Sequence, residues 1–215
     1  MTNRLTDVLT VAVLAFVAVR LVGGVRVARS NDGRSLIGEI VRGLGWRHMW
    51  PVPLVLAAVL AVAVPLMMVP GLDWGWWSAL GGDGNPVFGS SSTTAGSSWE
   101  WLVPLMFMCL LIPALPLFAH AEERMFRAGA QQWSWPRRVA KVLQFGIIHA
   151  VVGIPIGAAL ALSVGGAYFM GVYLRTWRST YEQRLAELES TRAHTMYNGL
   201  IIALVGVAYA VEAAL

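Results

Sequence analysis

The chain has 215 residues, of which 57% are hydrophobic and 13% are charged. Soluble globular proteins contain about 25% charged residues, so this chain has too few charges to cover the surface of a soluble particle. Its apolar residues also come in long blocks, which indicates an integral membrane protein and excludes a secreted enzyme or a nucleic-acid-binding module. The net charge of +4 comes from basic residues clustered between the apolar blocks, a pattern that sets membrane topology rather than a phosphate-binding face.

The N-terminal half contains two apolar blocks, residues 8–25 and 50–69, which predict two transmembrane helices. The segment between them, residues 26–47, carries five arginines against two acidic residues, whereas residues 71–100 contain no lysine or arginine. Because loops rich in basic residues stay in the cytoplasm, we expect the first segment inside and the second outside. The tryptophans of the outer segment mark the membrane interface.

A third apolar block, residues 101–119, is followed by a charged segment, residues 122–141, with five basic residues. This order predicts a third transmembrane helix that ends in the cytoplasm. The next apolar block, residues 142–174, is 33 residues long, or ~50 Å as a single helix, far more than the ~30 Å hydrocarbon core. It therefore predicts two crossings, with a break at one of three places: Gly153, Pro155 or the Gly165-Gly166 pair.

Residues 175–192 are hydrophilic, contain four arginines and predict another cytoplasmic segment. Residues 181–192 are rich in helix formers and predict either a separate cytoplasmic helix or an extension of a transmembrane helix. The block 194–215 predicts the last crossing. The sequence thus predicts an all-α, polytopic membrane helix bundle with about six transmembrane helices and both ends outside. Arginine provides all but one of the sixteen basic residues, which indicates GC-rich coding and a bacterial cell membrane as the location.

Ionisable and amide side chains occur at four places within or at the ends of these blocks. One of them, Arg20, has a side chain long enough to reach the inner headgroups and is assigned no chemistry. Such groups are costly in a membrane, so the residues at the other three places are candidate functional residues. These three places fall in the predicted cytoplasmic half: Glu122, Glu123 and Arg127; His149; and His194 with Asn198. Each place also has a structural explanation, because side chains four residues apart form helix-surface ion pairs and a buried histidine or asparagine hydrogen-bonds to a neighbouring helix.

Together the three places predict a hydrolytic site. A carboxylate beside an imidazole activates a water molecule, and a second imidazole with a carboxamide donates hydrogen bonds to the oxygen that becomes negative when this water attacks a carbonyl. A positive charge beside the base would weaken it. We therefore expect Arg127 to orient Glu123 rather than to contact Glu122.

Three motifs follow one another along the chain: E-E-x-x-x-R at residues 122–127, F-x-x-x-H at 145–149 and H-x-x-x-N at 194–198. With these motifs, residues 104–215 resemble the CAAX protease and bacteriocin-processing (CPBP, Abi-type) family of glutamate-dependent intramembrane endopeptidases. The resemblance implies that residues 101–215 form a catalytic core and residues 1–100 an N-terminal two-helix membrane region with an outer loop. It also implies hydrolysis of a membrane-associated peptide or protein, without metal or cofactor, at a site that opens to the cytoplasm.

The resemblance implies a role for each candidate residue. Glu122 is the implied general base for the attacking water, and His149 assists it. His194 and Asn198 are implied to form the oxyanion site, while the second glutamate and the arginine of the first motif support the base. The family includes the enzyme that removes the last three residues of prenylated CAAX proteins, and its bacterial members are linked to bacteriocin maturation and self-immunity.

Three other functions are compatible with these residues to different degrees. His149, His194 and one of the two glutamates would hold a zinc ion with an open water position, although the H-E-x-x-H spacing is absent. A non-catalytic membrane scaffold or regulatory protein would use the same pocket to hold a peptide or a transmembrane partner. An ion-coupled transporter is disfavoured, because no internal repeat is evident and the polar groups lie on one side.

Overall fold

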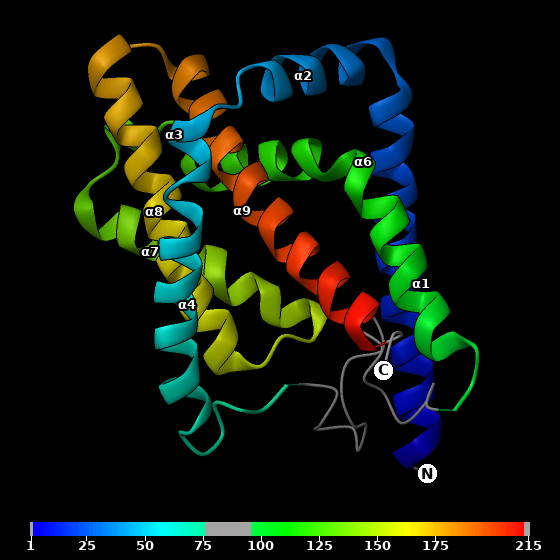
Figure 1. The fold of residues 1–215 in the computed structure, drawn as a ribbon. Helices are drawn as coiled ribbons and strands as arrows, with labels where there is room; N and C mark the ends of the chain where they lie inside the picture. Colours follow the sequence, from blue (N-terminus) through cyan, green and yellow to red (C-terminus); the bar gives the residue numbers. More distant parts are fainter. Residues whose placement is uncertain (1, 76–95, 213–215) are drawn as a thin grey trace.

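The computed structural model describes residues 2–75 and 96–212. Every regular element in these residues is a helix, which confirms the predicted all-α class (Figure 1). The α-helices (α) and 3-10 helices (η) are, in chain order, α1 (Thr2–Arg29), α2 (Asn31–Arg42), α3 (Trp46–Met49), α4 (Val52–Met67), α6 (Trp99–Arg127), η2 (Ala130–Gln132), α7 (Trp135–Ile147), η3 (Ile148–Val152), α8 (Ile156–Thr180) and α9 (Gln183–Glu212).

Three helical segments are long and apolar enough to cross a membrane, namely Trp46–Met67, Leu105–Gln132 and Ile156–Thr180. They correspond to the second, third and fifth of the six predicted crossings, and the other three crossings stay predictions. The fourth falls on α7, whose 13 residues span about 20 Å, less than the ~30 Å hydrocarbon core. The predicted outer loop at residues 71–100 lies mostly outside the described residues.

The long apolar block is interrupted at Gly153 and Pro155, two of the three predicted places. Gly153 has a φ of 93°, a left-handed conformation that residues with a side chain rarely adopt, and its amide donates a hydrogen bond to the carbonyl of Ala150. Pro155 directly precedes α8, where its fixed φ and missing N–H are tolerated. Gly165 and Gly166 lie within α8 instead.

The hydrophilic segment at residues 175–192 is mostly helical. Helix α8 continues to Thr180, the chain turns at Tyr181 with a φ of 56°, and α9 begins at Gln183. Of the two alternatives for residues 181–192, an extension of the last helix is therefore correct, and the predicted start of that helix at residue 194 is wrong. The physical reason is that Glu, Gln, Arg, Leu and Ala favour a helix whether or not the surroundings are apolar.

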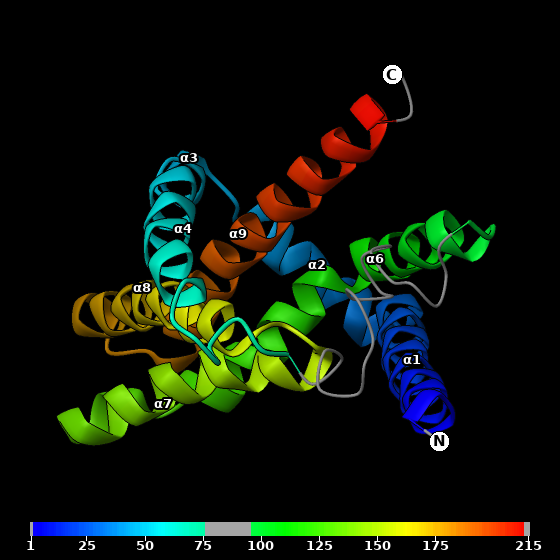
Figure 2. The same ribbon diagram turned by 90° about the horizontal axis from the view of Figure 1, so that it is seen from below.

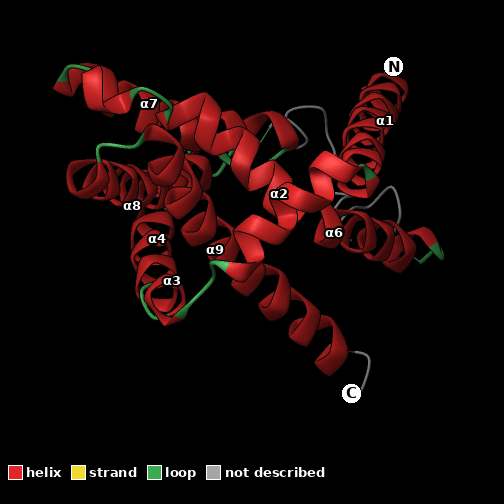
Figure 3. Ribbon diagram, turned by 90° about the horizontal axis from the view of Figure 1, so that it is seen from above, coloured by secondary structure: helices red, strands yellow, loops and turns green. Residues whose placement is uncertain are grey.

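The helices pack largely in pairs. Helix α1 runs along α6, α4 and α7 pack against α8, and α9 contacts both α6 and α8. Seen from below, α1 and the first part of α6 lie apart from the group formed by α4, α7 and α8 (Figure 2). Helix α2 lies across one end of the bundle, beside the start of α9 (Figures 1 and 3). We call this the α2 end.

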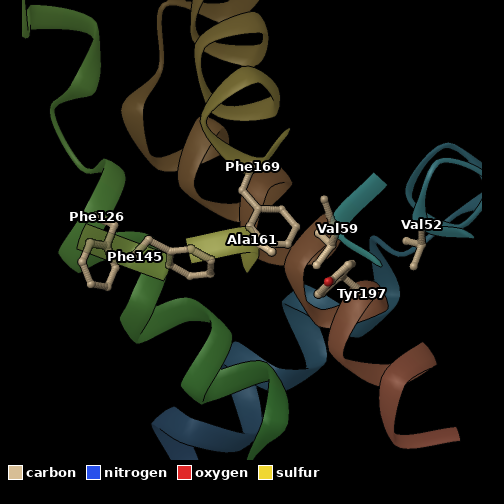
Figure 4. Packing of buried hydrophobic residues seen from close by; sticks show 8 residues of the cluster. Val52, Val59, Phe126, Phe145, Ala161, Phe169 and Tyr197 are labelled. Carbon is tan, nitrogen blue, oxygen red and sulfur yellow. The ribbon is translucent and has the colours of Figure 1, made fainter. Parts of the chain in front are cut away.

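A core of buried residues forms where α4, α6, α7, α8 and α9 meet (Figure 4). The ring of Phe145 contacts Phe126 and Phe169 edge to face, at centroid distances of 5.5 Å and 6.0 Å. Helix α7 approaches α8 so closely at Gly146 that a side chain there would overlap the carbonyl oxygen of Ala159. Small residues commonly permit such approaches between membrane helices, and here the contact fixes the end of α7 beside α8.

Candidate functional site

Glu123 is the centre of a polar cluster between α6 and α9, and it is fully buried. Its Oε1 accepts hydrogen bonds from Nη1 of Arg127 at 2.7 Å and from Nδ1 of His194 at 2.8 Å. Its Oε2 accepts a hydrogen bond from the hydroxyl of Ser190. The predicted pairing of Glu123 with Arg127 is therefore confirmed, and the pair lies in the core rather than on the helix surface. We call these four residues the Glu123 cluster.

Arg127 balances the buried charge of Glu123. Its guanidinium lies 4.4 Å from the centroid of the Phe145 ring, and its Nη2 donates to the carbonyl of Gly166 at 3.3 Å. A charge in the protein interior costs several kcal/mol unless a partner of opposite charge and further hydrogen bonds compensate it. Because Arg127 is so engaged with Glu123, it supports that carboxylate, as the sequence predicts.

His194 is fixed on two sides by aromatic rings. Phe169 stacks on its imidazole at a centroid distance of 4.4 Å, and Phe145 meets it edge to face at 5.5 Å. The ionised carboxylate of Glu123 only accepts hydrogen bonds, so Nδ1 of His194 carries a proton. The opposite ring atom, Nε2, lies 3.7 Å from Oε2 of Glu122. A buried carboxylate that orients a histidine through Nδ1 is also the arrangement of the serine-protease triad.

Glu122 differs from its neighbour Glu123 in having a free carboxylate. Its side chain is 34% exposed, and its Oε2 is buried without a hydrogen-bond partner in the described part of the chain. The 3.7 Å separation from His194 leaves this oxygen near an imidazole without a direct hydrogen bond. A buried carboxylate oxygen of this kind accepts a hydrogen bond from water or from a ligand.

His149 lies beside Phe145 rather than beside the glutamates. Its Nδ1 lies 2.8 Å from the carbonyl oxygen of Phe145 and donates to it, so Nε2 is left available, and the two rings meet edge to face at 5.2 Å. Within residues 2–75 and 96–212, His149 makes no hydrogen bond or ion pair with Glu122. The histidine nearest to Glu122 is His194, whereas the sequence predicted His149 in that place, because spacing along the chain does not determine which helices meet.

Asn198 follows His194 by one turn of α9 and is half-buried. Its amide forms no hydrogen bond with the described side chains of the Glu123 cluster. The structure thus joins four of the six predicted residues by direct contacts and connects His149 to them through the Phe145 ring. Among the described residues, it shows no hydrogen bond of the Asn198 amide to this group.

Two members of the site, Ser190 and Phe169, were not predicted. Ser190 precedes His194 by four residues and therefore lies on the same face of α9. That spacing would have identified Ser190 had the helix been predicted to begin before residue 194. Phe169 lies in an apolar helix that offers many equivalent residues, and no sequence signal distinguishes it.

A second, unpredicted ionic cluster holds α9 to the chain that precedes α4. Glu189 forms ion pairs with Arg47 at 3.0 Å and with Arg192, and it hydrogen-bonds to Nε2 of His48 at 3.0 Å. The amide of Gly45 donates to Nδ1 of His48, so the proton of this ring is on Nε2 and is donated to Glu189. This cluster fixes the segment of α9 that carries Ser190 and His194.

The pKa of Glu189 reflects these contacts. Burial of the carboxylate raises its pKa, but the hydrogen bonds from His48 and Arg192 and the charge of Arg47 outweigh burial and lower the pKa to about 2. Glu189 is therefore ionised over the whole physiological pH range, and the cluster stays intact there.

The described residues do not assemble a metal site. In them, no three His, Cys, Asp or Glu side chains are grouped so that they could hold a metal ion. Of the zinc ligands considered from the sequence, His194 lies within 4 Å of both glutamates, whereas Nδ1 of His149 hydrogen-bonds to the Phe145 carbonyl.

Comparison with protein-family models, with curated proteins and with solved structures finds no match for this chain. The resemblance to the CAAX protease and bacteriocin-processing family therefore depends on the three sequence motifs. The arrangement of their side chains is the remaining basis for a functional conclusion.

Proposed function

We propose that this protein is an intramembrane endopeptidase that hydrolyses a peptide bond of a membrane-associated substrate with a water activated by Glu122. One observation carries the proposal. Among the described residues, a buried oxygen of the Glu122 carboxylate has no hydrogen-bond partner, and this oxygen lies 3.7 Å from Nε2 of a histidine that Glu123 fixes in place. A free carboxylate and an oriented imidazole that face each other are the minimum apparatus for general acid–base hydrolysis.

In the proposed reaction, Glu122 removes a proton from a water molecule while the water oxygen attacks the carbonyl carbon of the scissile bond. The tetrahedral intermediate carries its negative charge on the former carbonyl oxygen. When it collapses, the C–N bond breaks and Glu122 returns the proton to the leaving amine. Water is thereby divided between the two products, and no covalent enzyme intermediate or cofactor is needed.

His194 and Asn198 stabilise the oxyanion in this proposal. Because Nδ1 of His194 donates to Glu123, Nε2 donates to an oxyanion only when the ring carries a second proton. The Asn198 amide, one turn further along α9, provides a second donor. His149 keeps an available Nε2, but it lies beside Phe145 rather than Glu122, so this proposal does not assign it to the base.

The proposed setting is a bacterial cell membrane with six crossings, both ends outside and the α2 end in the cytoplasm. Two of the arginine-rich segments, residues 26–47 and 175–192, lie at this end (Figure 1), which agrees with the positive-inside rule. We further propose residues 101–215 as the catalytic core and residues 1–100 as an N-terminal two-helix addition, of the kind that a CPBP resemblance implies.

The test is proteolysis with matched variants. Purified full-length protein is reconstituted in vesicles with a bacterial membrane proteome, and newly formed N-termini are labelled and identified by mass spectrometry. We expect the wild type and the Glu182→Gln control, which alters an exposed glutamate of the α8–α9 turn, to form the same new termini. Glu122→Gln should reduce them roughly 10²- to 10⁴-fold, as loss of a general base does.

Equal cleavage by Glu122→Gln and the wild type would refute the proposed base. Absence of new termini with the wild type would favour the non-catalytic scaffold. Addition of a zinc chelator distinguishes the glutamate-dependent mechanism from a zinc-dependent one. We expect cleavage to persist in its presence, because the proposed mechanism uses no metal. Its loss with the chelator and recovery with zinc would show a zinc-dependent protease.

A further inference from the structure

The α2 end contains a cavity of about 490 Å³ between α2, the end of α6 and the start of α9. Its lining includes Leu36 from α2, His120 and Arg124 from α6, and Glu187 and Leu188 from α9. The four residues of the Glu123 cluster are not among the residues described around this cavity. The cavity is therefore a second site, separate from the proposed hydrolytic one.

Charges of both signs face this cavity. Arg124 is exposed and has no ion-pair partner in the described part of the chain, and Arg184, also part of the lining, is 76% exposed and pairs with Glu39 at 2.7 Å. Glu187 provides a carboxylate whose Oε1 accepts a hydrogen bond from Gln183 at 2.8 Å. A simple anion would be repelled by Glu187 and a simple cation by the arginines, so the lining fits a ligand that carries both charges.

His120 adds a hydrogen-bond acceptor to the cavity lining, because its contacts determine which ring nitrogen carries the proton. The hydroxyl of Thr191 donates its proton to the carbonyl of Glu187 at 2.7 Å. The 3.2 Å contact between Thr191 and Nδ1 of His120 must therefore have Nδ1–H as its donor. In the neutral ring, Nε2 of His120 is then left as an acceptor.

We propose that this cavity binds the headgroup of a phospholipid that carries a phosphate and a primary ammonium, the chemistry of phosphatidylethanolamine. Arg124 and Arg184 donate charge-assisted hydrogen bonds to the phosphate oxygens. The carboxylate of Glu187 and Nε2 of His120 accept hydrogen bonds from the ammonium. A quaternary ammonium has no N–H to donate, and a glycerol headgroup has no positive charge, so the site distinguishes three common headgroups.

The surroundings of the cavity favour a lipid over a free zwitterion or phosphate. Helix α2 lies across this end of the bundle (Figure 3), and short arginine-rich segments of this kind lie at the level of the headgroups. Leu36 and Leu188 make part of the wall apolar. This site does not depend on the proposed hydrolysis.

Lipid binding to the full-length protein tests the proposal. Protein delipidated in detergent is titrated separately with phosphatidylethanolamine, phosphatidylcholine and phosphatidylglycerol, and native mass spectrometry measures the bound fractions. We expect the wild type to bind phosphatidylethanolamine most tightly. Arg124→Gln should weaken this binding roughly tenfold, since a hydrogen bond to a charged group contributes that much. Glu187→Gln should instead remove the preference for phosphatidylethanolamine over phosphatidylcholine.

Matched controls are Arg178→Gln and Glu182→Gln, which alter exposed charges outside the cavity lining and should bind like the wild type. Circular dichroism shows whether each variant is folded. If Arg124→Gln does not fold, Glu187→Gln still tests the selectivity of the site. Equal binding by Arg124→Gln and Arg178→Gln, or equal affinity of the wild type for all three lipids, would overturn the proposal. Displacement of phosphatidylethanolamine by millimolar inorganic phosphate would identify a site for free phosphate instead.

Discussion

Nδ1 of His194 lies 2.8 Å from Oε1 of Glu123, although the two residues are 71 positions apart. This contact joins α9 to α6 and determines which nitrogen of the imidazole carries the proton. It also separates the roles of two adjacent glutamates. Glu123 has three hydrogen-bond partners and is fully buried, whereas Glu122 has a buried oxygen that no described residue hydrogen-bonds. The first is suited to orient a group and the second to react.

Removal of Arg127 should destabilise the protein strongly. Arg127→Met leaves the buried carboxylate of Glu123 without its counter-charge, and we expect a loss of about 3–5 kcal/mol in the free energy of unfolding. The double variant Arg127→Met/Glu123→Gln should recover more than half of this loss, because no buried charge then remains. Unfolding in mixed detergent micelles measures both values. An unfolding free energy of Arg127→Met equal to that of the wild type would show that Glu123 and Arg127 are not buried together as described.

Ser190→Ala should also destabilise the protein, but by less than Arg127→Met. The variant removes the hydrogen bond to Oε2 of Glu123, and an unsatisfied buried acceptor costs about 1–3 kcal/mol. The matched control is Ser179→Ala, because the Ser179 hydroxyl is exposed and donates only to a carbonyl of its own helix. Its change should stay within about 0.5 kcal/mol. Similar unfolding free energies for the two variants would contradict a role for Ser190 in the site.

The close contact of α7 with α8 should not tolerate a side chain at Gly146. Gly146→Ala places a methyl group against the backbone of Ala159 and the side chain of Ser163, and overpacking of this kind typically costs about 1–3 kcal/mol. Gly171→Ala is the control, since a Cβ atom added at that residue would have no neighbouring atom within 4 Å among the described residues. That variant should gain stability, because alanine favours a helix over glycine. Thermal unfolding that ranks the two variants in the reverse order would exclude this packing.

The Glu189 cluster should make stability depend on pH in acid. The pKa of Glu189 is lowered to about 2 from its ordinary 4.5, so its stabilising contribution is complete above the ordinary value and is lost as the pH falls towards 2. We expect Glu189→Gln to be less stable than the wild type at pH 6, by about 1–3 kcal/mol, and the difference to shrink below pH 4. Unfolding midpoints measured from pH 2 to 7 check this. A difference independent of pH would contradict it.

The oxyanion role of Asn198 can be measured once a cleaved substrate is identified. Asn198→Ala should lower kcat about 10²- to 10³-fold with little change in unfolding free energy, because its amide bonds to no described side chain and a single oxyanion donor contributes that factor. Unchanged kcat would remove Asn198 from the mechanism and leave His194 as the proposed donor.

The sequence by itself determined the helical class and the apolar segments. It limited the interruption of the long apolar block to three places, of which the structure selected Gly153 and Pro155. It also determined the pairing of Glu123 with Arg127. These features depend on composition or on contacts within about one helical turn, where spacing alone fixes which side chains meet. The start of α9 could also have been predicted from the sequence, since residues 183–192 are rich in helix formers.

Only the tertiary structure decided which glutamate is free, that His194 rather than His149 lies beside Glu122, and that Ser190 completes the cluster. It alone placed His48 against Glu189, 141 positions away. These contacts join different helices, and their geometry depends on how helices cross and on small residues such as Gly146 that let them approach. Motif spacing along one chain contains no information about those crossings, so the same six candidate residues were compatible with several arrangements until the helices were packed.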